Sequence, residues 1–209
     1  ARTAELAATN DQLREREHEL QHAAFHDPLT ELPNRRYLVE RCESALAHAE
    51  RHQESVALLL IDLDHFKPIN DRFGHAAGDL MLQVIAKRLR EHVRAGDAVS
   101  RLGGDEFAAL ICGSDAENQA REIAARLVSE LSVPVHYGAE RLRVTVSIGA
   151  ALYPCHAQSF TGLYKAADAA LYRVKELGRS GSRIHGDDGE LSEQACLQLD
   201  VLKVPSGLA

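Results

Sequence analysis

The sequence predicts an α/β sandwich, in which helices pack on a mainly antiparallel sheet. Segments with the apolar period of amphipathic helices alternate with short apolar segments typical of strands. Two of the strand segments flank a Gly-Gly pair, which is typical of an antiparallel hairpin. At 209 residues, the chain is long enough for one domain with an extension at each end.

Residues 1–25 are predicted to form a helix ahead of the domain. The segment contains no Pro or Gly, and Leu6, Leu13 and Leu20 follow a heptad spacing. Two interpretations remain open: a solvated single helix, or the end of a parallel coiled-coil stalk that brings two copies together. Arg16 falls on the other side of the same seam and would make the coiled coil weak.

The domain is predicted to span residues 26–185. It begins with a break at His26–Asn34, which contains two prolines, and a helix is expected from Arg35 to His52. Val56–Asp64 is a continuous apolar run that ends in acids, which predicts a buried central strand. Gly78–Val93 has the apolar spacing of an amphipathic helix.

The second half of the domain continues the alternation of strands and helices. Ala98–Ile111 is predicted to form two short strands around the Gly-Gly pair. Ala116–Leu131 and Leu163–Leu177 are amphipathic and are predicted to be helices. Leu142–Leu152 alternates apolar and polar residues, which predicts a half-buried strand. Ser182–His185 is expected to form a short edge strand.

Residues 186–209 are acidic and lack apolar periodicity, so they are predicted to form a poorly ordered tail. This segment holds five acids against one lysine, in a chain whose net charge is −7. The negative charge argues against a nucleic-acid-binding surface, which would normally be basic. It does not argue against a nucleotide substrate, because a metal and a few well-placed cations can hold a triphosphate.

Cysteine usage and hydropathy favour the cytoplasm. The four cysteines are scattered without a C-x-x-C pair, and the eleven histidines show no H-E-x-x-H spacing, so no zinc motif is recognised. No apolar run approaches the roughly 20 residues that cross a bilayer, so no membrane segment is expected within the chain. The chain begins at Ala1 rather than Met, which leaves an upstream sensor or anchor open.

Two acidic features point to a metal site. The central strand reaches the rim of the sheet at Asp62, and Gly103–Phe107 reads GGDEF. Asp105 and Glu106 would point to opposite faces of an extended strand. One carboxylate from each of two strands could then share Mg²⁺, which prefers one or two carboxylates plus phosphate oxygens. The alternative is a hairpin turn with solvated acids and with Asp64 as a helix cap, and the residues alone leave both open.

Several separated motifs resemble one enzyme family, the GGDEF-domain diguanylate cyclases, from about Phe25 to His185. The resemblance rests on DPLTELPNRR (27–36), DLDHFKPINDRFGHAAGD (62–79), RLGGDEF (101–107), VTVSIGAAL (144–152) and ADAALYRVKELGRSG (167–181). It implies a five-stranded, mainly antiparallel sheet surrounded by helices, similar to nucleotidyl cyclases and the polymerase palm. It also implies an enzyme that joins two GTP molecules into cyclic di-GMP and releases two pyrophosphates.

The resemblance assigns roles to the two acidic features. Asp62 and Asp105 would bind Mg²⁺ or Mn²⁺, with the backbone carbonyl of Leu63 as a third ligand. Glu106 would either assist the metal site or accept the proton of the 3′-hydroxyl group. Gly103–Gly104 would let the backbone lie against the nucleotide.

The resemblance also assigns nucleotide-binding residues. Asn70 and Asp79 match positions that form hydrogen bonds with guanine, and a carboxylate at position 79 favours GTP over ATP because guanine offers it two donors. Lys67, Lys175 and Arg179 match phosphate-binding positions that would hold the leaving pyrophosphate. Lys67 is thereby grouped with the acids of the GGDEF turn as a catalytic residue.

One further motif implies regulation. Arg94 and Asp97 form an R-x-x-D sequence five residues ahead of the Gly-Gly pair. Alone, this is the ordinary end of a helix; in the resembling family it implies an allosteric site where cyclic di-GMP inhibits its own synthesis. Glu31 and Ser180 depart from the usual Gly and Asn of the family motifs, at positions outside the metal and guanine sites.

The implied chemistry requires two copies of the chain. Each copy would hold one GTP, and the 3′-hydroxyl of each GTP would attack the α-phosphate of the other, so a homodimer is expected. Residues 1–25, together with an upstream sensor domain, would regulate that dimerisation. The alternative function is a catalytically silent GGDEF domain that only binds cyclic di-GMP or GTP as a receptor. The intact acids favour the enzyme.

Overall fold

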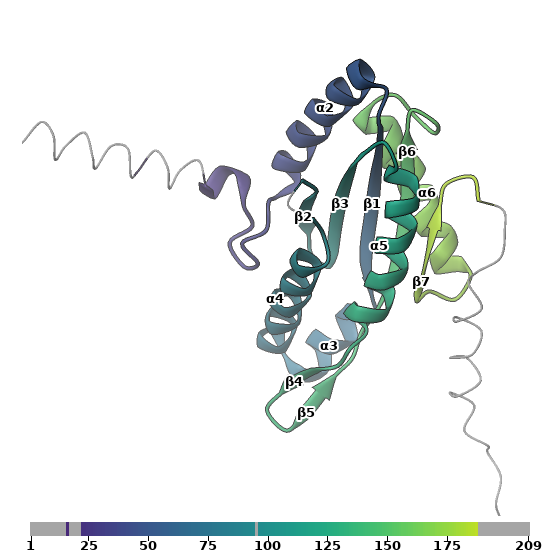
Figure 1. Cartoon of the computed structure of the whole chain (residues 1–209). Coiled ribbons are helices and arrows are strands. Elements are labelled where there is room, and N and C mark those ends of the chain that lie inside the picture. Colours follow the sequence, from purple (N-terminus) through teal and green to yellow (C-terminus); the bar gives the residue numbers. More distant parts are fainter. Residues whose placement is uncertain (1–15, 17–21, 95, 188–209) are drawn as a thin grey trace, which may run out of the picture.

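The computed structural model describes Arg16, residues 22–94 and residues 96–187 (Figure 1). Most of the predicted stalk helix (1–25) and nearly all of the predicted acidic tail (186–209) therefore lie outside the described residues. Within the described part of the chain, no helix combines the length and the apolar character needed to cross a bilayer.

A five-stranded sheet forms the centre of the domain, in the order β2-β3-β1-β6-β7 (Figure 1). The central strand β1 (Ser55–Asp64) pairs antiparallel with β3 (Glu106–Gly113) and with β6 (Thr145–Tyr153). β2 (Ala98–Gly103) is antiparallel to β3, and the edge strand β7 (Gly181–Ile184) is parallel to β6. The predicted five-stranded, mainly antiparallel sheet is confirmed.

Helices cover both faces of this sheet. α4 (His75–Glu91) and α5 (Ala116–Leu131) pack on one face, and α2 (Arg35–His52) and α6 (Phe160–Glu176) pack on the other. In the view of Figure 1, α5 lies in front of the sheet and α6 behind it. A short helix, α3 (Phe66–Phe73), follows β1 directly.

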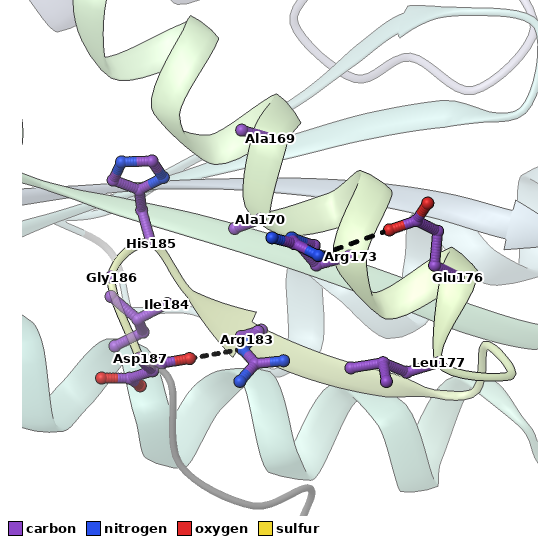
Figure 2. Close-up of a pocket in the computed structure, with 10 residues that line it drawn as sticks. All are labelled: Ala169, Ala170, Arg173, Glu176, Leu177, Arg183, Ile184, His185, Gly186 and Asp187. Atoms are coloured by element: carbon purple, nitrogen blue, oxygen red, sulfur yellow. Dashed lines mark hydrogen bonds and ion pairs between the residues drawn. The ribbon is translucent and has the colours of Figure 1, made fainter.

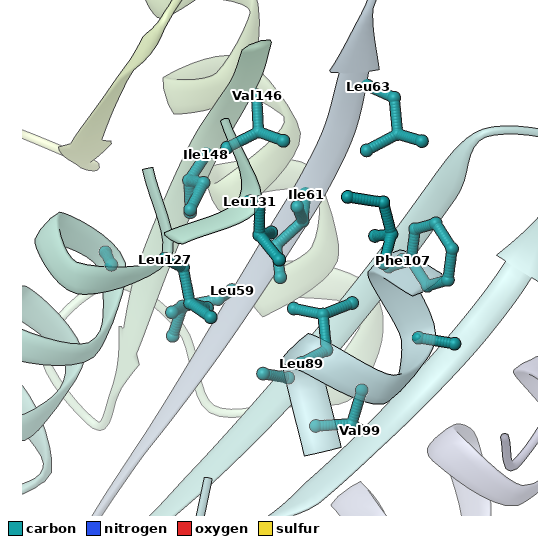
Figure 3. Close-up of a cluster of buried hydrophobic side chains, with 14 of the residues drawn as sticks. Leu59, Ile61, Leu63, Leu89, Val99, Phe107, Leu127, Leu131, Val146 and Ile148 are labelled. Carbon is teal, nitrogen blue, oxygen red and sulfur yellow. The ribbon is translucent and has the colours of Figure 1, made fainter. Parts of the chain in front are cut away.

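The alternation of side chains along β1 divides the core into two layers. Leu59 and Ile61 belong to the layer under α4 and α5, where they meet residues such as Leu127 (Figure 3). Leu58 and Leu60 belong to the layer under α2 and α6. Both faces of a strand must be apolar when helices cover both faces, which explains the continuous apolar run in the sequence.

Four elements differ from the sequence-based expectation. The helix α3 is separate from α4, and the two strands of a ribbon, β4 (Val135–Tyr137) and β5 (Glu140–Leu142), were not predicted. β6 is buried along almost its whole length, so its description as half-buried is wrong. The polar Ser147 that suggested exposure is fully buried, because its hydroxyl donates to the carboxylate of Asp64 across the sheet.

Candidate active site

The GGDEF turn joins β2 to β3 at one end of the sheet. Gly103 pairs with Glu106, so the two turn residues are Gly104 and Asp105, one position later than expected. Asp105 is therefore outside the strand, and the expectation that it alternates with Glu106 across a strand is wrong. Gly103 and Gly104 have φ of 143° and 54°, a region that favours glycine because it has no Cβ.

Pairing between β1 and β3 brings the two acidic features together. Asp62 lies directly opposite Glu106, and the amide of Leu63 donates to the carbonyl oxygen of Asp105 at 3.2 Å. Directly paired residues point to the same face of a sheet, so Asp62 and Glu106 share the face that α6 covers. The arrangement follows from the strand register, which the sequence motifs alone do not show.

The carboxylate of Asp62 is held in an environment that suits a bound cation. Its side chain is 13% exposed. Burial raises the pKa of Asp62, the hydrogen bond and charge of Lys175 lower it, and the nearby charges of Asp105 and Asp64 raise it further, with a net upward shift. The oxygen donors available are two carboxylates and the neighbouring backbone carbonyl of Leu63, a set that fits the preference of Mg²⁺ for few carboxylates and additional phosphate oxygens.

Two of the predicted phosphate-binding cations reach this acidic end of β1. Nζ of Lys175, in the last turn of α6, lies 2.8 Å from Oδ2 of Asp62. Nε of Arg179, just after α6, lies 3.9 Å from Oδ1 of Asp64. Lys67 is exposed in the first turn of α3, which leaves the same end of β1. The structure therefore brings Lys175 and Arg179, from the end of α6 and the segment after it, to the carboxylates of β1.

Asp64 does not cap the following helix, which corrects the expectation. The residue before α3 is His65, and no side chain caps the helix there. β1 continues through Asp64, so this side chain lies two residues from Asp62 on the same face of the sheet. Its carboxylate instead accepts hydrogen bonds from β6 and from the segment after α6.

A glycine that sequence reasoning missed positions one of the two predicted guanine-binding residues, Asn70. Asn70 lies in α3 and Asp79 in the first turns of α4, and the two helices are separated by Gly74. A Cβ added at Gly78 would collide with Oδ1 of Asn70, so the Asn70 amide rests on α4 next to Asp79. A glycine inside a helix costs about 1 kcal/mol relative to Ala, which was the available signal.

Replacing Gly78 with Ala is expected to weaken GTP binding by about tenfold, because the new methyl group displaces the Asn70 amide from the guanine site. The measurement is the Kd of GTP and of ATP by calorimetry. Gly96→Ala is the control for an added methyl group outside the guanine site, since nothing lies within 4 Å of an added Cβ there; because Gly96 lines the Arg94 pocket, both variants are compared without cyclic di-GMP. Unchanged GTP affinity in Gly78→Ala would show that Asn70 is not held for guanine.

The opening segment of the domain supports the GGDEF turn through Arg101. Nε and Nη2 of Arg101 donate to the carbonyl oxygen of Gly104 at 3.1 and 2.7 Å, and Nη1 donates to Oδ1 of Asp27 at 2.9 Å. Burial would raise the pKa of Asp27, but hydrogen bonds from Thr30 and Arg101 outweigh it and hold the pKa below its usual value. The sequence marked 26–34 as a break and 27–36 as a family motif, but gave neither Asp27 nor Arg101 a role.

The predicted allosteric residues lie in a separate pocket of about 630 Å³. Arg94 and Asp97 line it together with Tyr37, Arg41 and Arg90. Oδ1 of Asp97 accepts from the backbone amide of Cys112 at 3.3 Å, which ties this side chain to β3. The pocket is rich in guanidinium groups, and so is suited to an anionic ligand.

A second pocket of about 510 Å³ lies between α6 and β7 (Figure 2). Arg173 pairs with Glu176 at 3.7 Å, and Nε of Arg183 donates to the carbonyl oxygen of Asp187 at 2.6 Å. None of the predicted site residues lines this pocket. Asp62, Asp105 and Glu106 instead lie where β1 meets the GGDEF turn, and Lys175 contacts Asp62 there.

The sequence matches known proteins over most of its length. Residues 24–181 match the family model described as "Diguanylate cyclase, GGDEF domain". The bifunctional diguanylate cyclase/cyclic di-GMP phosphodiesterase MucR of Pseudomonas aeruginosa is 42% identical over 95% of this chain and 28% of MucR. The diguanylate cyclase TpbB of the same species is 40% identical over 93% of this chain and 44% of TpbB. The chain thus spans less than half the length of these curated relatives.

Solved structures share the fold. The isolated GGDEF domain of TpbB superimposes with a TM-score of 0.74 at 41% identity, over 83% of this chain and 99% of that one. The coiled coil and GGDEF domain of DgcB from Caulobacter crescentus, solved in complex with c-di-GMP, gives a TM-score of 0.81 at 28% identity. It covers 88% of this chain and 97% of the DgcB chain.

Proposed function

Because this chain belongs to the GGDEF-domain family of diguanylate cyclases, we propose that it condenses two GTP molecules into cyclic di-GMP and two pyrophosphates. One observation carries the proposal: Asp62 is paired opposite Glu106, close enough to Asp105 for the charges to interact, and in contact with Lys175. Carboxylates and a phosphate-binding cation thereby meet at one end of the sheet.

The acidic groups would hold the divalent ion and the reacting hydroxyl. Asp62 and Asp105, with the carbonyl oxygen of Leu63, are the proposed ligands of Mg²⁺ or Mn²⁺. When bound, the ion would lower the pKa of the 3′-hydroxyl group and stabilise negative charge on the phosphoryl oxygens. Glu106 is exposed on the same face of the sheet as Asp62, where it can assist the ion or accept the hydroxyl proton.

The remaining residues would bind GTP. Asn70 and Asp79 would form hydrogen bonds with guanine, and Asp79 would select it over adenine by accepting from two donors. Lys67, Lys175 and Arg179 would neutralise the triphosphate and the leaving pyrophosphate. Lys175 must then exchange its present partner, Asp62, for phosphate oxygens when GTP and the ion bind.

Catalysis is proposed to require a homodimer in the cytoplasm. One chain supplies only half of the reactants, and two facing copies would make the attack effectively intramolecular. Residues 1–25 would belong to a stalk that regulates this pairing under an upstream sensor. The DgcB structure, which contains a coiled coil and a GGDEF domain, supports that arrangement by similarity.

The test of the proposed function is incubation of the purified chain with GTP and Mg²⁺ over a range of protein concentrations, followed by chromatography of the nucleotides. Cyclic di-GMP that forms faster than linearly with protein concentration supports both the cyclase and the dimer. A strictly linear dependence down to high dilution would contradict the dimer requirement. Binding of cyclic di-GMP without product at any concentration would identify a silent receptor instead.

Product inhibition through the Arg94 pocket is expected to weaken in Arg94→Ala. Loss of a charge-assisted contact to a phosphate should raise the inhibition constant of cyclic di-GMP by about tenfold or more. The measurement is the initial rate with increasing amounts of added product. The control is Arg36→Ala, at an exposed position where the guanidinium pairs with Glu40 in a helical i,i+4 bridge and lies over the Phe25 ring. Equal inhibition of both variants would rule out the R-x-x-D site.

A further inference from the structure

The segment after α6 has an unusual backbone. Gly178, Arg179 and Ser180 have φ of 110°, 67° and 52°, so three successive residues lie in the left-handed region. The helix ends normally, with the amide of Arg179 donating to the carbonyl oxygen of Val174 at 3.0 Å and with glycine at the first left-handed position. Two further left-handed residues with side chains are strained, and such strain persists only where the surroundings hold it.

The carboxylate of Asp64 makes hydrogen bonds that hold this segment in place. Oδ2 accepts from the backbone amide of Ser180 at 3.1 Å and from Oγ1 of Thr145 at 2.8 Å. Oδ1 accepts from Oγ of Ser147 at 2.7 Å. The Asp64 side chain is completely buried, and Arg179 is its nearest cation. One carboxylate thus connects β1, β6 and the segment 178–180.

We propose that Asp64 is a positioning residue for the triphosphate of GTP: its carboxylate fixes the 178–180 turn, so that Arg179 is held at the end of β1 that carries Asp62. The inference rests on the proposed function and deepens it. Asp64 lies only two residues from Asp62, but its oxygens are already committed to three hydrogen bonds and it is sealed from solvent. These contacts make it a support for Arg179 rather than a ligand of the ion.

A purely structural role would rest on the hydroxyl contacts to β6 alone. Ser147→Ala removes one of those contacts and leaves the bond to the amide of Ser180 intact. This variant is the matched control for the loss of a buried hydrogen bond. If Asp64 only stabilises the sheet, Ser147→Ala and Asp64→Ala should differ in thermal stability but not in their relative affinity for different nucleotides.

The experiment compares two ligands by calorimetry in the presence of Mg²⁺: a non-hydrolysable GTP analogue and GMP. Asp64→Ala is expected to lower the affinity for the GTP analogue by about tenfold or more and to change the affinity for GMP by less than about twofold. The two ligands differ because only the polyphosphate of the analogue would reach Arg179. Asp64→Asn keeps an acceptor for the Ser180 amide and should restore most of the affinity. In a protein that already carries Arg179→Ala, adding Asp64→Ala should cause no further loss of affinity for the GTP analogue.

Three results would overturn the inference: equal weakening of both ligands, additive losses with Arg179→Ala, or wild-type affinity for the analogue in Asp64→Ala. If Asp64→Ala does not fold, Gly178→Ala strains the same turn without touching Asp64, and wild-type affinity in that variant also overturns it. Failure of the proposed function gives different patterns: a chain that does not use GTP binds neither ligand, and a silent GTP receptor binds the analogue but forms no cyclic di-GMP from GTP.

Discussion

Asp62→Asn is expected to lower the rate of cyclic di-GMP formation by two to three orders of magnitude, since a metal ion contributes roughly several kcal/mol to phosphoryl transfer. The amide preserves the size of the side chain but removes the charge that the divalent ion and Lys175 both need. The fold should survive, because burial already disfavours the charged form of Asp62. The measurement is chromatography of nucleotides after incubation with GTP and Mg²⁺, together with a thermal melt.

The matched control for this substitution is Asp168→Asn, which makes the same change at an exposed position of α6. This control should retain wild-type turnover. More than about a tenth of wild-type turnover in Asp62→Asn, well above the loss expected for a metal ligand, would contradict the assignment of Asp62 to the ion.

Gly149→Ala is expected to destabilise the domain by about 3 kcal/mol or more, because overpacking against backbone cannot be relieved by rotating a side chain. A Cβ at this position of β6 would overlap the carbonyl oxygen of Ala167 and the amide nitrogen of Leu171, both in α6. Since α6 also carries Lys175, the shift should lower turnover as well as stability. Chemical denaturation with a fit of the unfolding free energy provides the measurement.

The control for packing at Gly149 is Gly96→Ala, where an added Cβ meets no atom within 4 Å. There the substitution should change stability by less than about 1 kcal/mol, as expected when the native backbone tolerates Ala. A similarly small change in Gly149→Ala would show that α6 can move away from β6 without cost.

The sequence was sufficient to predict the elements whose pattern of apolar and polar residues agrees with their burial in the structure. The apolar run of Val56–Asp64 predicts a strand covered on both faces, and β1 is such a strand. The Gly-Gly pair predicts the hairpin, although the turn falls one residue later, because Gly103 still pairs with Glu106. The alternation in Leu142–Leu152 led to the wrong prediction of a half-buried strand. Its polar residues include Ser147, whose hydroxyl donates to a buried carboxylate rather than to water.

The residues of the candidate site also fall into two groups, those that the sequence predicts and those whose contacts only the structure shows. Asp62, Asp105 and the proposed guanine and phosphate residues are predicted from motifs, which depend only on residue type and spacing along the chain. The contacts of Arg101, Gly78 and Asp64 were not predicted, because they join segments distant in sequence or depend on a close approach between two helices. Asp64 was even given the wrong role, because the sequence shows the helix that follows it but not the strand beside it.

By itself, then, the sequence determined the class of the fold, its central strand and the residues that would carry the chemistry, because apolar periodicity and short motifs are local properties. The tertiary structure alone decided that Asp62 faces Glu106, that Lys175 reaches Asp62, and that a buried carboxylate holds the strained turn after α6. These contacts depend on strand register and helix packing, which are set when distant segments bury their apolar faces together.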